Sequence, residues 1–167
     1  FIEPRLIRYD QDPKTHTPIS KKYSISELID HDGSVVIDGS AGAGKTTLLK
    51  RIGKLLIERN DSELEIKYLP VYISVIDIFE ADFDVYNAIQ QKIRLISEAP
   101  LNELKDEYVI QLLVDSIDEF SDTQSRKIID DLNSISNKYK IKYYIATRNA
   151  DYIISKSGSK ISNFNIR

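Results

Sequence analysis

Apolar residues along the chain form short strand-length runs that alternate with segments of helical period. Runs rich in β-branched and aromatic residues predict strands buried on both faces. These runs cover residues 34–38, 68–76, 108–115 and 141–147. Pro70 suits the start of its strand, where a missing N–H group costs least. The alternation of strands with helical segments predicts an α/β fold with a mainly parallel sheet.

The helical segments each carry apolar residues three or four positions apart, which marks one buried face per helix. The faces comprise Leu48, Leu49, Ile52, Leu55 and Leu56 in the first helix, Val85, Ile89, Ile93 and Ile96 in the second, and Ile128, Leu132, Ile135 and Tyr139 in the third. Capping-box sequences at residues 24–27 and 121–124 predict helix starts. The polar stretches 10–22 and 155–160 are expected to be loops.

Composition narrows the chemistry available to the chain. Its 167 residues suit one domain, and the absence of methionine together with the first residue, Phe1, predicts a piece of a longer protein. Without cysteine, disulfides and thiolate metal sites are excluded, and two histidines are too few for a histidine metal centre. Catalysis would therefore fall to carboxylates, lysine, arginine and hydroxyl groups.

The charge and hydropathy of the chain indicate which partners it can bind and where in the cell it is expected. The formal charge of −3 is spread along the chain, so it gives no direct signal for nucleic acid or an anionic membrane. No apolar run approaches the roughly 18 residues of a membrane span, and the first residues do not form a signal peptide. We therefore expect a cytoplasmic protein that does not bind membranes.

The stretch "GSAGAGKTTLL" begins where the first predicted strand ends and leads into a helix. It fits the phosphate-binding pattern G-x-x-x-x-G-K-[ST] (the P-loop), in which small residues let backbone N–H groups surround a phosphate. We expect Lys45 to reach the β- and γ-phosphates of a nucleotide and Thr46 to bind Mg²⁺. The alternative is a glycine-rich turn with an exposed lysine. The predicted nucleotide-binding residues are Gly39, Ser40, Ala41, Gly42, Ala43, Gly44, Lys45, Thr46 and Thr47.

The stretch "LLVDSIDEF" supplies carboxylates at the end of another predicted strand. Asp115 follows a mainly apolar run, where an acid is costly without a cation or donors, so we expect it to orient Mg²⁺ through a water molecule. The alternative is that Asp115 only caps a loop. Asp118 or Glu119 could polarise an attacking water or tune the metal site, and the alternative for each is a solvated loop carboxylate.

Thr147 and Arg148 end the last predicted strand. Ligands of parallel sheets bind at the carboxyl ends of the strands, so both side chains should face the same opening as the P-loop. Arg148 could contact the γ-phosphate and report its presence, and the alternative is an arginine paired with a surface acid.

Three motifs give most of the chain a resemblance to the NACHT domains of the STAND class of P-loop NTPases. "GSAGAGKTTLL" resembles their phosphate loop, "YYIATRN" their sensor strand, and "LLVDSIDEF" their acidic motif, with the small residue Ser116 after Asp115. "FIEPRL" at residues 1–6 is similar to the family's lead-in segment, which lies near the adenine. The resemblance implies a P-loop three-layer sandwich with helices on both sheet faces. It also implies one domain over 1–167, with a lead-in segment and short helix at 1–33 and a P-loop core at 34–167.

The resemblance further implies an ATP/ADP-binding domain that hydrolyses ATP slowly with Mg²⁺ and controls oligomerisation in signalling or innate defence, including prokaryotic antiviral defence. The full-length protein would self-associate through further domains, whereas this fragment alone is expected to be monomeric. The implied catalytic residues are Lys45, Asp115, Asp118, Glu119 and Arg148. The leading alternative is a conventional ATPase motor or loader subunit with rapid turnover. A small-molecule kinase and a scaffold without nucleotide binding are further alternatives.

Overall fold

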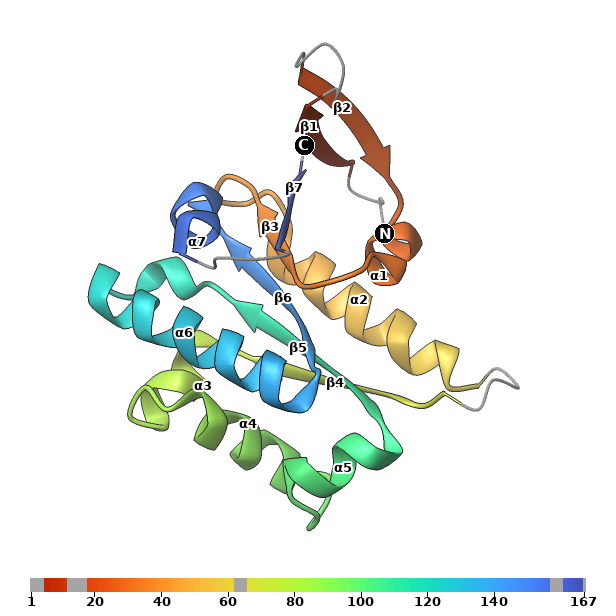
Figure 1. The fold of residues 1–167 in the computed structure, drawn as a ribbon, viewed down its shortest axis with the longest axis vertical. Coiled ribbons are helices and arrows are strands. Elements are labelled where there is room, and N and C mark those ends of the chain that lie inside the picture. Colours follow the sequence, from red (N-terminus) through yellow and green to blue (C-terminus); the bar gives the residue numbers. More distant parts are fainter. Residues whose placement is uncertain (1–4, 12–17, 62–65, 157–160, 167) are drawn as a thin grey trace.

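A seven-stranded sheet forms the centre of the computed structural model, which describes residues 5–11, 18–61, 66–156 and 161–166 (Figure 1). The strand order is β2-β1-β7-β3-β6-β5-β4. The strands are β1 (Leu6–Gln11), β2 (Pro18–Tyr23), β3 (Val35–Asp38), β4 (Tyr68–Ile73), β5 (Val109–Asp115), β6 (Lys142–Thr147) and β7 (Ser162–Ile166). All neighbours from β7 to β4 run parallel, and β1 is antiparallel to both β2 and β7. The predicted α/β class with a mainly parallel sheet is confirmed.

Helices cover both faces of the sheet (Figure 1). They are α1 (Ile25–Asp30), α2 (Lys45–Arg59), α3 (Val75–Glu80), α4 (Val85–Arg94), α5 (Leu101–Glu107), α6 (Asp122–Tyr139) and α7 (Ala150–Lys156), with a short 3₁₀ turn, η1 (Ile117–Glu119). Both predicted capping boxes are present, at Ser24 before α1 and at Ser121 before α6. No helix within the described part of the chain is long and apolar enough to cross a membrane.

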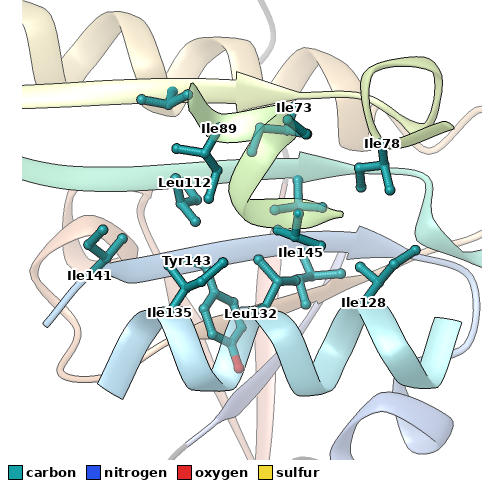
Figure 2. Close-up of a cluster of buried hydrophobic side chains, with 14 of the residues drawn as sticks. Ile73, Ile78, Ile89, Leu112, Ile128, Leu132, Ile135, Ile141, Tyr143 and Ile145 are labelled. Carbon is teal, nitrogen blue, oxygen red and sulfur yellow. The ribbon is translucent and has the colours of Figure 1, made fainter. Parts of the chain in front are cut away.

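Alternate residues of the central strands face opposite layers of the core. On β5, Leu112 and Val114 join the cluster under α4, α6 and α7, whereas Leu113 joins the cluster under α1 and α2. Figure 2 shows the first cluster, where Leu132 and other apolar residues of α6 lie against Tyr143 and Ile145 of β6. The two apolar layers hold the sheet between its helices and fix the positions of the strand ends.

Several predicted boundaries are wrong. The strand predicted over 68–76 ends at Ile73, because the side chain of Ser74 accepts a hydrogen bond from the N–H of Asp77 and starts α3. Pro70 is the third residue of β4, and it is tolerated there because β4 is an edge strand. Ile96 lies beyond the end of α4 and is 66% exposed.

The stretch 10–22, predicted to be a loop, lies in strands wherever it is described. Its ends belong to β1 and β2, which pair with each other over residues 6–11 and 18–23. Of the stretch 155–160, residues 155 and 156 belong to α7, and the remainder lies outside the described residues. The lead-in "FIEPRL" lies outside them up to residue 4, and its last residue, Leu6, starts β1 and is fully buried.

Lys142 joins β6 to the C-terminal end of α1. Its ammonium nitrogen, Nζ, donates to the carbonyl oxygens of Leu28, Ile29 and His31 at 3.3, 2.9 and 2.6 Å. These carbonyls have no partner within the helix, so the lysine satisfies them. Burial lowers the pKa of Lys142 to about 8, although nearby aspartates act in the opposite direction.

Asn60 covers part of the open edge of β4. Its side-chain amide donates to the carbonyl of Tyr68 at 2.9 Å and accepts from the N–H of the same residue at 2.7 Å. The asparagine thus pairs with the strand as a neighbouring strand would, immediately after the end of α2.

Candidate functional site

The loop between β3 and α2 has the geometry of an anion-binding turn. Gly42 and Gly44 adopt φ angles of 75° and 91°, a left-handed conformation that costs glycine little. The N–H of Ala43 donates to the carbonyl of Ser40 at 3.2 Å. Gly44 precedes the 15-residue helix α2 and provides no side-chain cap. The first N–H groups of α2 and the positive end of its dipole are therefore available to a phosphate.

Lys45, the first residue of α2, folds back over this loop. Its Nζ donates to the carbonyl oxygens of Gly39 at 2.6 Å and Ser40 at 2.9 Å. An ammonium group has three donors, so one remains for a ligand in the loop. The two backbone contacts hold the positive charge at the mouth of the turn.

A second group of polar side chains gathers around Asp115, at the end of β5. The hydroxyl of Thr46 donates to its Oδ2 at 2.7 Å, and the hydroxyl of Tyr72 donates to the same oxygen at 2.7 Å. Ser116 Oγ donates to Oδ1 at 3.2 Å. Asp115 is only 5% exposed, and these three hydroxyls provide the donors that a buried carboxylate needs.

Tyr72 is a member of this group that sequence reasoning missed. Its burial, together with the hydrogen bond and charge of Asp115, raises the pKa of the phenol above its usual value. The hydroxyl therefore remains a donor at neutral pH. Nothing in the sequence around β4 marks this residue, because its role depends on β4 lying beside β5 in the sheet.

Arg148 and Asp118 form an ion pair between the end of β6 and η1. The guanidinium Nε donates to Asp118 Oδ2 at 2.6 Å, and the side chains of Arg148 and Asp118 are 52% and 14% exposed. The hydrogen bond and charge of Asp118 raise the pKa of Arg148. Arg148 is thus paired with an acid, and that acid is another of the predicted site residues.

These residues surround a pocket of about 410 Å³ at the carboxyl ends of the strands. Its walls consist of Ala41, Gly42, Ala43, Gly44, Lys45, Thr46, Thr47, Ser116, Asp118, Glu119 and Arg148. Asp115 lies behind this wall, in contact with Thr46. Gly39 and Ser40 contribute the carbonyls that hold Lys45. The structure therefore brings the loop, the acidic motif and Arg148 to one opening.

One predicted orientation is wrong. Thr147 was expected to face this opening with Arg148, but it is fully buried and its hydroxyl accepts from the N–H of Asn149 at 3.0 Å. The side chain stabilises the turn after β6, and Arg148 alone reaches the pocket from this strand end.

The donors near the loop suit Mg²⁺ in its usual phosphate sites. Among the described residues, no three His, Cys, Asp or Glu side chains gather as a metal site. Mg²⁺ beside a nucleotide is held by one or two oxygen ligands together with phosphate oxygens and water. The Thr46 hydroxyl, with the Asp115 carboxylate behind it, fits that set of hard oxygen donors.

Comparison with known proteins finds solved structures that share this fold. No family model matches the sequence, and no curated protein matches it significantly. The solved structures that resemble the chain include domain III of the replication initiation protein DnaA from Thermotoga maritima. That match has a TM-score of 0.51 and 15% identity, and covers 86% of this chain and 59% of that one.

Two further structures are similar. A Drosophila ORC bound to GC-rich DNA and Cdc6 gives a TM-score of 0.55 at 11% identity, covering 86% of this chain and 28% of that one. A replication initiator DnaA bound to AMPPCP and single-stranded DNA gives a TM-score of 0.50 at 17% identity. This match covers 83% of this chain and 43% of that one. The chain thus spans at most 59% of the length of these structures, and the likeness concerns the fold.

Proposed function

We propose that this domain binds ATP or ADP with Mg²⁺ at the pocket and hydrolyses ATP slowly. The observation that carries the proposal is the 2.7 Å contact between the Thr46 hydroxyl and the Asp115 carboxylate, directly behind the P-loop. Two separate motifs of the sequence meet in this contact. The bound nucleotide analogue in the similar DnaA structure supports a nucleoside triphosphate as the ligand.

Each residue would have a distinct task. The β- and γ-phosphates would bind the N–H groups at the start of α2 and the remaining donor of Lys45. The Thr46 hydroxyl donates a hydrogen bond to Asp115, so the lone pairs of its oxygen remain for Mg²⁺. Mg²⁺ would neutralise developing phosphate charge when bound. Asp118 or Glu119 would polarise the attacking water, and Arg148 would contact the γ-phosphate.

The ion pair between Arg148 and Asp118 supports a nucleotide-controlled switch. The γ-phosphate of ATP would attract the Arg148 guanidinium away from Asp118, whereas ADP has no γ-phosphate to do so. Asp118 would therefore have different partners in the two nucleotide states. Together with the resemblance of its motifs to NACHT domains, this favours a switch that controls oligomerisation in signalling or innate defence, with prokaryotic antiviral defence as one setting.

A motor or loader ATPase with rapid turnover is the second candidate. The observation that favours it is the likeness in fold to replication initiators, including structures bound to DNA. The two candidates differ in rate, because a motor must cycle quickly whereas a switch holds its nucleotide. Typical enzymes turn over about 1–1,000 times per second, so a switch should lie far below that range.

The experiment is to denature the purified protein, identify any released nucleotide, and measure Mg-ATP turnover. The matched pair of variants is Lys45→Ala, in the pocket, and Lys50→Ala, on the exposed side of α2. We expect co-purified ADP, slow turnover, and loss of binding only in Lys45→Ala. Unchanged ATP affinity in Lys45→Ala would contradict the proposed site. Empty protein that hydrolyses ATP rapidly would favour the motor.

A further inference from the structure

We propose that Tyr72 is a positioning residue for the Mg²⁺ site, acting through the Asp115 carboxylate. The inference rests on the proposed function and adds a residue that belongs to neither of the two motifs. Tyr72 lies on β4, whereas the P-loop follows β3 and Asp115 ends β5.

The sheet register explains how Tyr72 reaches the site. Tyr72 of β4 is paired with Leu113 of β5, and Asp115 lies two residues further along β5 on the same face. The long side chain of Tyr72 spans this diagonal between the two parallel strands. The phenol hydroxyl lies 2.7 Å from Asp115 Oδ2. This contact therefore depends on β4 being the neighbour of β5.

The two hydroxyls on Oδ2 fix the orientation of the carboxylate. A carboxylate oxygen has two lone-pair positions, and on Oδ2 they accept from Thr46 and Tyr72, both at 2.7 Å. Within the described part of the chain, Oδ1 accepts only from Ser116, at 3.2 Å, and keeps a position for a water ligand of Mg²⁺. With both positions on Oδ2 filled, the carboxylate cannot rotate without losing a charge-assisted hydrogen bond.

Removal of the phenol hydroxyl should therefore loosen the metal site and leave phosphate binding intact. Tyr72 does not line the pocket, so it would not contact phosphates bound there. Hydrogen-bond partners of metal ligands typically account for about 10–100-fold in metal affinity. Because Asp115 would act through water, we expect a smaller effect, about three- to tenfold.

The test compares Tyr72→Phe with Tyr143→Phe. Tyr143 is a matched control because its hydroxyl donates at 2.6 Å to Asn133, away from the pocket. The affinity of a fluorescent ADP derivative is measured in excess Mg²⁺ and in EDTA. In Tyr72→Phe, the gain in affinity from Mg²⁺ should fall about three- to tenfold, with the affinity in EDTA within about twofold of wild type. Tyr143→Phe should keep the full gain.

Three other outcomes would overturn the inference. An unchanged Mg²⁺ gain in Tyr72→Phe, with a wild type that binds nucleotide and responds to Mg²⁺, would refute the role of Tyr72 alone. Equal weakening in Mg²⁺ and in EDTA would show that Tyr72 supports the loop and not the metal site. A wild type that binds no nucleotide, or binds it without a Mg²⁺ effect, would refute the proposed function and this inference together.

Discussion

The buried ammonium group of Lys142 should make the protein more stable as the pH rises from about 8 to 10.5. Burial lowers the pKa of Lys142 from 10.5 to about 8 in the folded state. Below pH 8 the lysine is charged in both states, and the folded protein bears the full cost of the buried charge. Between the two pKa values the unfolded chain binds more protons, so the free energy of unfolding increases with pH.

The size of the effect follows from the pKa difference. Each pKa unit corresponds to about 1.4 kcal/mol, so a fully realised shift would give about 3.4 kcal/mol. Lys142 keeps part of its contact with solvent, so we expect about 2 kcal/mol. The three carbonyl groups at the end of α1 are the partners of the charged group.

The assay is urea unfolding of wild type and Lys142→Met at several pH values between 7 and 10.5. Tyrosines and other lysines titrate in both proteins, so the difference between the two free energies isolates Lys142. We expect this difference to shift in favour of wild type by about 2 kcal/mol across the range. A difference that stays constant, or shifts in favour of the variant, would refute the reasoning.

Three further predictions concern other parts of the molecule. Lys140→Gly should raise the free energy of unfolding by about 1 kcal/mol, because Lys140 ends α6 in a left-handed conformation with a φ of 56°, which costs glycine less than lysine. Lys138→Gly, within the helix, should lower the free energy of unfolding, and thermal melts of both variants check the pair. Asn60→Ala should cost about 1–2 kcal/mol in urea unfolding, because Tyr68 loses two partners, and no loss would contradict the edge contact. Asp118→Asn should slow ATP turnover about tenfold or more while the affinity for ADP stays nearly unchanged. Turnover equal to that of wild type would show that Asp118 is not the residue that polarises the attacking water.

The buried strands and long helices could be predicted because their patterns are strong. On β5, Ile110, Leu112, Leu113 and Val114 form a short, mainly apolar run that is typical of a buried strand, and the structure places the strand at Val109–Asp115. The P-loop and the acidic motif were located by spacing and by the elements around them. Their meeting follows from the parallel sheet, which brings the ends of β3 and β5 to one edge.

The elements that were missed have weak or misleading patterns. The described residues of β2 are largely exposed, so the strand lacks the apolar alternation that reveals a half-buried strand. At the end of β4, the apolar residues Val75 and Ile76 look like a continued strand, although Ser74 and Asp77 form a capping pair that could have indicated the helix start. Tyr72 could not be found from the sequence, because strand order is not encoded locally.

The position of β3 in the sheet has a consequence for synthesis of the chain. Its two neighbours, β6 and β7, are among the last elements to be translated, and the β1–β2 hairpin joins the sheet only through β7 among the described pairings. At about 5–20 residues per second, roughly ten seconds separate the P-loop from the strands that flank its own strand. On the ribosome, the P-loop therefore emerges before β6 and β7, and β3 gains both of its neighbouring strands only after the residues up to Ile166 have left the exit tunnel.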